Sequence, residues 1–294
     1  MTIHGPADGW VVAPDGRKFW GRAGAAGLLV VDPERGVLLQ HRAVWSHFGD
    51  TWGIPGGARA FDETAVEGAL RESAEEASVP PAALRLLFSS VVDLDIWSYT
   101  TVVARADTPF EPVIADRESE ALRWVPLDTV DDLPLHPGFA SSWARLRDLV
   151  TTPLHLVVDS ANVVGSKPDG WWRDRVGATD RLAVALEALA VSGLPAAAVG
   201  DRDGLVSTWW PDVSLVVEGQ AKAAQDPAPG SPLRLVRAPA DGDQALVDEV
   251  ERLRAGGGAA PHVVAVTADR ELAARVEALG ATVVGPSILR DLLP

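Results

Sequence analysis

The sequence predicts an α/β protein of two domains, one over residues 1–150 and the other over residues 151–294. A length of 294 residues favours two domains of ordinary size over one. In the first half, short apolar runs between turn residues predict strands, and one long acidic segment predicts a helix. In the second half, apolar runs alternate with helical segments, which is typical of a mostly parallel sheet.

The composition excludes several classes of protein. Hydrophobic residues make up 47% and charged residues 23%, so the chain can form cores and is not of the disordered class. Cysteine is absent, which excludes disulfides, thiolate metal sites and a cysteine nucleophile. We expect a cytoplasmic protein, because the start has no basic-then-apolar signal and no apolar run reaches membrane-spanning length. The net charge of −15 argues against a basic surface for nucleic acid, but it permits nucleotide binding through cations.

The first half opens with short strands. Residues 10–20 predict a hairpin, because the Pro-Asp-Gly sequence inside this range has the chemistry of a tight turn. The apolar runs 24–31 and 37–40 predict two more strands, joined by a turn. Residues 52–57, Trp-Gly-Ile-Pro-Gly-Gly, then lead into the helix.

The helix carries a group of acids. Asp62 is its expected N-cap, and the two prolines from Pro80 are expected to end it. Glu72, Glu75 and Glu76 are spaced three and four residues apart, so their carboxylates share one face of a helix. A divalent cation would remove their repulsion, and oxygen ligands suit Mg²⁺ or Mn²⁺. The alternative is an ordinary solvated acidic face.

More strands and two helices are predicted after the acidic helix. In order, they are two strand-like runs within 84–95, a strand over 98–105, a strand that includes Trp124, a short helix over 127–134 and an amphipathic helix over 139–150.

The segment from Gly57 to Val79 resembles the Nudix box. That pattern has glycine, five residues, glutamate, seven residues, Arg-Glu, an apolar residue, any residue, Glu-Glu, any residue, glycine and an apolar residue. The chain matches seven fixed positions over 23 residues: Gly57, Glu63, Arg71, Glu72, Glu75, Glu76 and Val79. It departs at Ser73, where the pattern has an apolar residue, and at Ser78, where the pattern has glycine.

This resemblance implies a Nudix α/β/α sandwich around a mixed sheet, and hydrolysis of the diphosphate linkage in a nucleoside diphosphate attached to another group. It implies Glu75 and Glu76 as ligands of Mg²⁺ or Mn²⁺, together with the carbonyl of Gly56 or Gly57. Glu72 is then either a ligand or the base that activates water.

Two further acids and one ion pair are candidates. Glu63 and Arg71 lie about two helical turns apart, and we interpret them mainly as a structural pair that orients the carboxylate of Glu72. Glu118 and Glu120, just before Trp124, resemble the segment that often adds one more carboxylate to the metal site. Because alternation permits both on one face of a strand, the sequence does not choose between them. A solvated acidic loop is the alternative.

Substrate contacts are predicted on both sides of the Trp52 segment. His41, Arg42 and His47 could contact the substrate, although structural roles for the histidines stay open. Gly56 and Gly57 would let the backbone approach a metal or phosphate, and the alternative is a plain turn before a helix.

The second half follows a linker at residues 151–153. Its predicted elements are a strand over 154–158, a helix over 179–192, strands over 196–200 and 214–217, a helix over 242–255, a strand over 263–267, a helix over 269–279 and a strand over 282–284.

Acids follow several of these strands. Asp159, Glu218, Asp243 and Asp269 lie near predicted strand ends or helix starts, where α/β sheets bind ligands. The segments around them resemble the NYN branch of the PIN-like nucleases, in which carboxylates bind a divalent metal for phosphodiester hydrolysis. The resemblance implies metal ligation by Asp159, Asp243 and Asp269, with Glu218 weaker. Helix capping is the alternative, and Gln244 stands where a second acid is expected.

The sequence thus predicts a metal-dependent pyrophosphohydrolase fused to a ribonuclease-like domain. The candidate substrates are a nucleotide, a nucleotide-sugar, a dinucleotide or a capped RNA 5′ end. RNA binding by the second half and homodimerisation stay open, and the tryptophan pairs at 171–172 and 209–210 could stack bases. The alternative function is a nucleotide- or RNA-binding regulator with one or both sites inactive.

Overall fold

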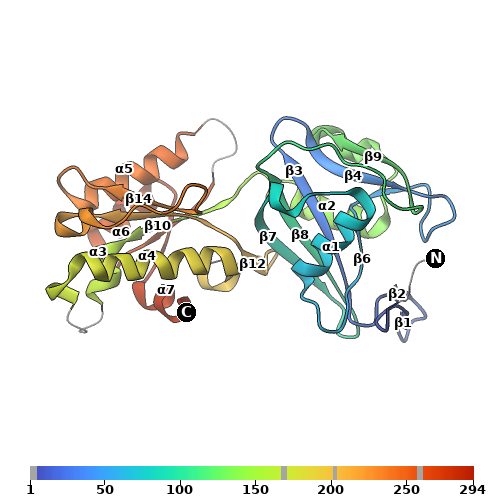
Figure 1. The fold of residues 1–294 in the computed structure, drawn as a ribbon, viewed down its shortest axis with the longest axis horizontal. Helices are drawn as coiled ribbons and strands as arrows, with labels where there is room; N and C mark the ends of the chain where they lie inside the picture. The colour runs from blue at the N-terminus through green and yellow to red at the C-terminus, as the bar shows by residue number, and fades with distance from the viewer. Residues whose placement is uncertain (1–4, 167–170, 201–203, 257–260) are drawn as a thin grey trace. The chain divides into compact units, whose positions relative to one another are not determined.

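The chain is described by a computed structural model, which covers residues 5–166, 171–200, 204–256 and 261–294. It separates into two compact units, residues 1–151 with 205–207, and residues 152–204 with 208–294 (Figure 1). Within the described ranges, no helix is long and apolar enough to cross a membrane.

The first unit is built on a mixed sheet. The strands run in the order β7 (Leu84–Asp93), β8 (Ser98–Ala106), β3 (Ala25–Asp32), β4 (Gly36–Arg42) and β5 (Trp52–Gly53), with β6 (Gly56–Ala58) on β3 and β9 (Ser119–Val125) on β4. The β3–β8 pair is parallel and the others are antiparallel, so the expected mixed sheet is confirmed. The predicted hairpin is also present, as the two-stranded sheet of β1 (Trp10–Val12) and β2 (Lys18–Trp20).

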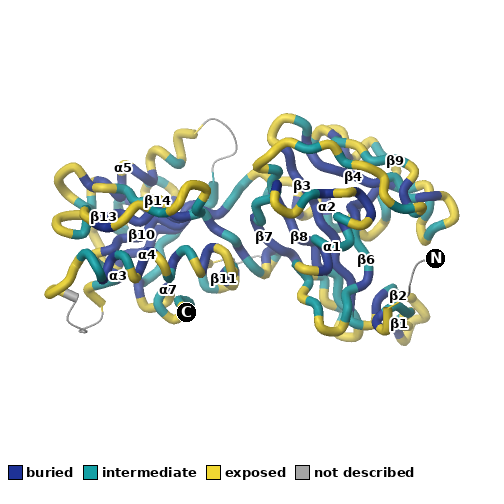
Figure 2. The backbone as a smooth tube through the Cα atoms, in the orientation of Figure 1, coloured by how far each residue is buried: buried dark blue, intermediate teal, exposed yellow. Residues whose placement is uncertain are grey.

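The core of this unit lies between the sheet and helix α1 (Ala65–Ala77). Every residue of β3 is buried, which explains its continuous apolar sequence (Figure 2). Ala69 and Ala77 of the helix pack in one cluster with Leu28 and Val102 of the sheet. Because these helix residues are small, the backbone of α1 comes close to the strands that carry the site. The remaining helices are η1 (Pro81–Ala83), η2 (Leu127–Asp132) and α2 (Pro137–Leu146).

The ends of α1 differ from the sequence prediction. Thr64, not Asp62, is the N-cap, because Thr64 and Glu67 form a reciprocal capping box. The helix ends before Pro80, at Ser78, which adopts a left-handed conformation with φ 52°. Ser78 occupies the position where the family pattern has glycine, the residue that accepts this conformation without steric cost.

Other boundaries also differ. The two runs predicted within 84–95 form one strand, β7, with a register shift between Leu86 and Phe88. Helix α2 ends at Leu146 instead of residue 150.

The second unit contains a fully parallel sheet, as the alternation of strands and helices predicts. Its order is β14 (Leu233–Arg237), β13 (Asp212–Val217), β10 (Leu154–Asp159), β15 (His262–Val266) and β16 (Thr282–Val284). A short pair, β11 (Leu194–Pro195) with β12 (Thr208–Trp209), is antiparallel. The helical segments are α3 (Ser160–Gly165), η3 (Trp171–Arg173), α4 (Arg175–Ser192), η4 (Ala196–Val199), η5 (Gly219–Ala223), α5 (Gly242–Arg254), α6 (Arg270–Ala278) and α7 (Pro286–Leu292).

One predicted strand of this unit is wrong. Residues 196–200 form the 3₁₀ helix η4, which ends at Gly200 with φ 86°. Three consecutive alanines after Pro195 favour helical over extended backbone. Strand β14 and helices α3 and α7 were not predicted.

Candidate functional site

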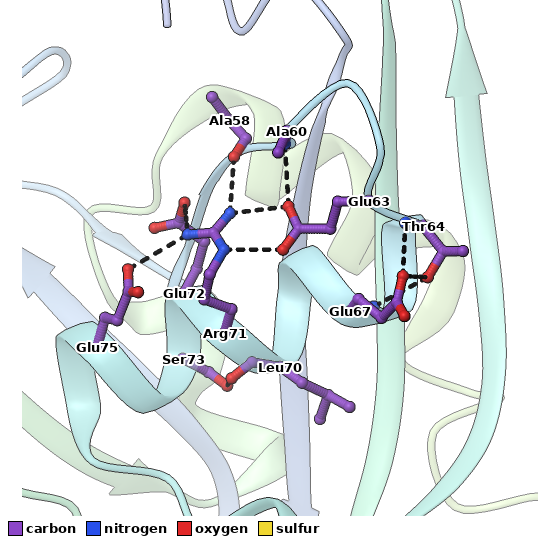
Figure 3. Close-up of polar contacts among 10 residues, drawn as sticks. All are labelled: Ala58, Ala60, Glu63, Thr64, Glu67, Leu70, Arg71, Glu72, Ser73 and Glu75. Atoms are coloured by element: carbon purple, nitrogen blue, oxygen red, sulfur yellow. Dashed lines mark hydrogen bonds and ion pairs between the residues drawn. The ribbon is translucent and has the colours of Figure 1, made fainter. Parts of the chain in front are cut away.

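Arg71 is the centre of a polar network on helix α1 (Figure 3). Its guanidinium donates two hydrogen bonds to Glu63, Nε to Oε1 at 2.8 Å and Nη2 to Oε2 at 2.9 Å. Nη1 donates to Oε1 of Glu72 at 2.7 Å and to Oε2 of Glu75 at 3.2 Å. Nη2 also donates to the Ala58 carbonyl at 3.1 Å, so the side chain ties the helix to β6.

The network changes the protonation of its members. The hydrogen bond from Arg71 lowers the pKa of Glu63 and raises that of Arg71. The pKa of Glu72 is raised, because burial outweighs the stabilisation of its charge by Arg71. Arg71 therefore fixes one oxygen of a carboxylate that binds protons more readily than an exposed one.

Gly57 makes room for Glu72. A Cβ atom at position 57 would lie 2.7 Å from the carboxyl carbon of Glu72, a distance that Cβ atoms essentially never show. A Cβ on Gly56 would lie 2.5 Å from the Ala26 carbonyl oxygen on β3. At position 56 the close neighbours are backbone atoms, so packing requires glycine, whereas at position 57 a Cβ atom would force the Glu72 carboxyl to move. The predicted approach of this backbone to a metal or phosphate stays a prediction.

Glu76 is the buried carboxylate of the helix. Its side chain is 7% exposed, whereas the Glu75 carboxylate is largely in solvent. Oε2 of Glu76 accepts hydrogen bonds from the Gly56 N–H at 3.0 Å and from Nε2 of Gln40 at 3.3 Å. Gln40 is fully buried and also donates to the Ser119 hydroxyl, at 2.7 Å. The hydrogen bonds from Gly56 and Gln40 therefore both go to Oε2 of Glu76.

Two acids from a distant loop join Glu76. Ligand oxygens of Glu76, Asp116 and Glu118 all lie within 4.8 Å of one another, the one such group of three among the described residues. The loop is held against α1 by two backbone hydrogen bonds, from Val113 N–H to the Ala77 carbonyl and from Ala115 N–H to the Glu76 carbonyl. The Ser119 hydroxyl donates to Asp116 at 2.9 Å, which continues the chain of hydrogen bonds from Gln40.

The sequence left the choice between Glu118 and Glu120 open, and the structure separates them. Oε1 of Glu120 accepts from the Val44 N–H at 3.2 Å, and its Oε2 lies 3.8 Å from Nδ1 of His41. Only Glu118 approaches Glu76. Asp116 was missed, because nothing in the acidic run 116–120 indicates which side chains turn toward a helix forty residues earlier.

The electrostatics of this cluster favour a cation. Burial, followed by the charges of Glu72 and Asp116, raises the pKa of Glu76 to about 8, against the lowering effect of the Gly56 N–H. Oε1 of buried Gln40 has no hydrogen-bond partner within the described ranges. A set of carboxylates that repel one another, beside an amide oxygen without a donor, fits a hard divalent cation such as Mg²⁺ or Mn²⁺.

The predicted substrate residues lie on the far end of β4 and in the loop that follows. His41 stacks on Trp52 with ring centroids 4.8 Å apart, and its Nε2 lies 3.2 Å from the Asp50 carboxylate. Arg42 Nε donates to the His47 carbonyl at 3.2 Å. The charge of Arg42 acts on His47 and, as the smallest contribution, on Glu76. His41 makes structural contacts, whereas His47 is exposed.

In the second unit, Asp159 closes the central strand β10. Its carboxylate accepts from the N–H of Asn162 at 3.0 Å and from the Asn162 side-chain amide at 2.5 Å. The Thr267 hydroxyl, from the segment after β15, also donates to it, at 3.2 Å. The strand order reverses between β10 and β15, which is where open parallel sheets bind ligands.

Two of the other predicted acids, Asp269 and Glu218, bond to the N-terminal N–H groups of helices. Asp269 caps α6 by accepting from Glu271 and Leu272 N–H, and Glu218 accepts from Gly242 N–H at 3.0 Å. Asp241, not Asp243, is the cap of α5. The pKa of Asp243 is raised by burial and then by the charges of Asp241, Asp159, Asp269 and Glu218. The three other predicted acids therefore repel the charged form of Asp243. No three of the four predicted acids bring ligand oxygens within 4.8 Å of one another in the described structure.

Of the predicted stacking residues, Trp209 is 3% exposed and belongs to the core, whereas Trp172 is 52% exposed. The side chain of Trp171 lies outside the described part of the chain. Gln244, in place of the expected second acid, bonds to Asp248 and Arg275.

The first unit combines a mixed sheet, an acidic helix and a cluster of three carboxylates of which Glu76 is buried. Residues 21–146 match the family model of the NUDIX domain. The chain is 51% identical over 163 residues to a Mycobacterium tuberculosis "Putative 8-oxo-dGTP diphosphatase 3", and these residues span 52% of this chain and 75% of that protein.

Two further proteins are similar to part of this chain. A Bifidobacterium longum "Nucleoside triphosphate pyrophosphatase/Nudix hydrolase fusion protein" is 45% identical over 162 residues, 51% of this chain and 34% of that protein. The solved Nudix hydrolase RenU from M. smegmatis is 49% identical, with a TM-score of 0.45, over 48% of this chain and 94% of its own. The chain therefore belongs to the Nudix family of hydrolases. The resemblance of the second half to NYN nucleases stays a prediction.

Proposed function

We propose that the chain is a divalent-metal-dependent pyrophosphohydrolase that cleaves the diphosphate linkage of a nucleoside diphosphate derivative. One observation carries this proposal. The buried Glu76 of the Nudix-box helix meets Asp116 and Glu118 within 4.8 Å, in a site whose charges need a cation.

Glu76, Asp116 and Glu118 would hold the ion, with Glu75 or a carbonyl of the glycine pair completing its ligands. When bound, a Mg²⁺ or Mn²⁺ ion neutralises charge on the diphosphate and acidifies water. The protein supplies orientation. Gly56 and Gln40 fix Oε2 of Glu76, which leaves its Oε1 for the ion.

Glu72 is the second functional carboxylate in this proposal. Arg71 fixes its Oε1 at 2.7 Å, so Oε2 is the oxygen available to take a proton from the attacking water or to join the ligands. Burial raises its pKa, which makes it a stronger base than an exposed carboxylate while Arg71 still limits the shift. Arg71 and Glu63 position Glu72 and take no part in the chemistry.

The relatives suggest which substrates to test first. Two of them are named "Putative 8-oxo-dGTP diphosphatase 3" and "Nucleoside triphosphate pyrophosphatase/Nudix hydrolase fusion protein", so we infer that nucleoside triphosphates, including oxidised purines, are the leading substrates. Nucleotide-sugars, dinucleotides and capped RNA ends share the same linkage and belong in the same panel.

The test is phosphate or pyrophosphate release from this panel with Mg²⁺ or Mn²⁺. Glu76→Gln and Glu118→Gln are expected to reduce kcat/KM by about 100-fold or more, because each removes a ligand charge. Glu120→Gln is the matched control, since it makes the same change two residues further on, in strand β9 and outside the cluster, and should leave the rate unchanged. If no compound is hydrolysed while nucleotides still raise the melting temperature, the chain is a nucleotide-binding regulator instead.

A second activity is proposed for the region from 151 to 294, which we treat as a separate functional domain. Two observations support metal-dependent RNA cleavage there. Asp159 lies where the strand order reverses, and its charge, with those of Glu218 and Asp269, raises the pKa of Asp243. Asp159→Asn should abolish Mn²⁺-dependent cleavage of single-stranded RNA, whereas Asp248→Asn, on the exposed face of α5, should not. Equal cleavage by both variants would exclude the nuclease.

A further inference from the structure

Four aromatic rings from three distant segments of the first unit form a continuous row. Trp10 of β1 meets His47 edge-on at 5.3 Å, and His47 meets Phe48 at 4.3 Å, both in the loop between β4 and β5. Phe48 in turn meets His136, which caps helix α2, at 4.8 Å and 84°. We call Trp10, His47, Phe48 and His136 the aromatic row. Trp20 supports its outer end by packing on Trp10 at 5.1 Å.

The row is open to solvent. Trp10 is 45% exposed and Phe48 is 47% exposed. Phe48 holds a left-handed conformation, φ 54°, which is uncommon for an aromatic residue and costs about 1–2 kcal/mol. The loop keeps it there with a 2.6 Å hydrogen bond from the Thr51 hydroxyl to the Phe48 carbonyl and with the bond from Arg42 to the His47 carbonyl. The fold thus maintains an exposed ring at a steric cost.

The histidines of the row are uncharged at neutral pH. Burial and then the charge of Arg42 lower the pKa of His136 to about 4, and partial desolvation of the ring and then Arg42 lower the pKa of His47. Nδ1 of His136 accepts the Gly138 N–H at 3.1 Å, which assigns the remaining ring proton to Nε2. The row therefore presents aromatic faces and an N–H donor, without net charge.

Arg42 connects the row to the carboxylate cluster. Two residues before Arg42 on β4, Gln40 donates to Glu76 of the cluster, while Arg42 donates to the His47 carbonyl of the row. The charge of Arg42 acts on His47, His136 and Glu76. A ligand that reaches from the row to the cluster would place a flat uncharged group on the rings, an anionic group near Arg42 and a diphosphate at the ion. That is the layout of a nucleotide.

We propose that the aromatic row binds the nucleobase of the substrate by stacking and that His136 Nε2 donates a hydrogen bond to an acceptor on the base. This assignment rests on the proposed pyrophosphohydrolase function and extends it to specificity. Aromatic stacking accepts any base because each has a π face, so selection among bases would come from the His136 donor.

The experiment measures equilibrium affinity, so that it does not depend on turnover. Dissociation constants of GDP, ADP and inorganic pyrophosphate are determined with Mg²⁺ by calorimetry. Phe48→Ala should weaken GDP and ADP about 10-fold or more, because stacking on one ring contributes about 1–3 kcal/mol per base and each 1.4 kcal/mol is tenfold. Its affinity for pyrophosphate, which has no base, should not change. Phe48→Tyr should restore nucleotide binding.

The control is Trp45→Ala. Trp45 lies in the same loop and is 68% exposed, but it takes part in none of the ring contacts that build the row. A Phe48→Ala protein that binds GDP and ADP as the Trp45→Ala protein does, or that loses pyrophosphate in parallel, would overturn the assignment. If the wild type binds nucleotides through the row but hydrolyses none of them, the proposed hydrolysis is wrong, whereas the assignment of the row as the base-binding site is retained.

Discussion

Replacing Arg71 by methionine tests the ion network of α1, because methionine keeps much of the apolar stem and removes the charge. The variant leaves the carboxylates of Glu63 and Glu72, which are 13% and 16% exposed, without their counter-ion. Breaking a buried ion pair costs about 3–5 kcal/mol, and since Arg71 is itself 35% exposed we expect the lower figure of about 2–3 kcal/mol in unfolding free energy. The two hydrogen bonds to Glu63 should account for most of it.

A double-mutant cycle of Arg71→Met with Glu63→Gln isolates this pair. Local unfolding free energies are measured in the full chain by hydrogen exchange with mass spectrometry, over peptides from residues 21–146, so that the first unit is observed by itself. The expected coupling energy is about 1.5–2.5 kcal/mol. The control cycle uses Arg147 and Asp131, an exposed pair at 3.1 Å, which should couple by less than about 0.5 kcal/mol. Equal coupling in the two cycles would refute the structural role of Arg71.

Three further predictions follow from single features. Ser78→Gly should raise the unfolding free energy of the first unit by about 0.5–1 kcal/mol, seen as a higher urea midpoint, because glycine accepts φ 52° freely, and an unchanged midpoint would mean that the serine is not strained. Gly57→Ala should lower kcat by about 100-fold in a folded protein, since its Cβ would lie 2.7 Å from the Glu72 carboxyl carbon and push the carboxyl away, and full activity would contradict this packing. Glu249 is buried, and although burial opposes it, hydrogen bonds from Arg252, Arg234 and Ser214 lower its pKa to about 2 from 4.5. The depressed pKa gives stability that is present above pH 4.5 and is lost as pH falls toward 2, by about 2–3 kcal/mol, and Glu249→Gln should flatten this loss in acid unfolding curves.

Local patterns in the sequence predict much of the first unit. The spacing of Glu72, Glu75 and Glu76 places them correctly on one helix, since i+3 and i+4 neighbours share a face. The spacing does not show that Glu76 is buried while Glu75 is solvated, because burial depends on how α1 packs on the sheet. The match to the Nudix pattern also depends only on local residues, those from Gly57 to Val79.

What the sequence missed depends on contacts between distant segments. Asp116 reaches Glu76 only because backbone hydrogen bonds hold its loop on the end of α1, and no periodicity encodes that path. The aromatic row likewise joins residues 10, 47, 48 and 136, which share no local motif. In the second unit, the strand predicted over residues 196–200 was wrong because a short apolar run fits a strand and a helical turn equally well. Cytoplasmic location and homodimerisation stay predictions.

The central claim is that Glu76, Asp116 and Glu118 together hold a divalent cation, and Mn²⁺ titration of the full chain tests it most directly. The dissociation constant is measured by calorimetry for the wild type, Asp116→Asn and Glu120→Gln. We predict that Asp116→Asn weakens Mn²⁺ binding by about 10-fold or more, because it removes one charged oxygen ligand, and that Glu120→Gln leaves it unchanged. Equal affinities for the wild type and Asp116→Asn would contradict the site.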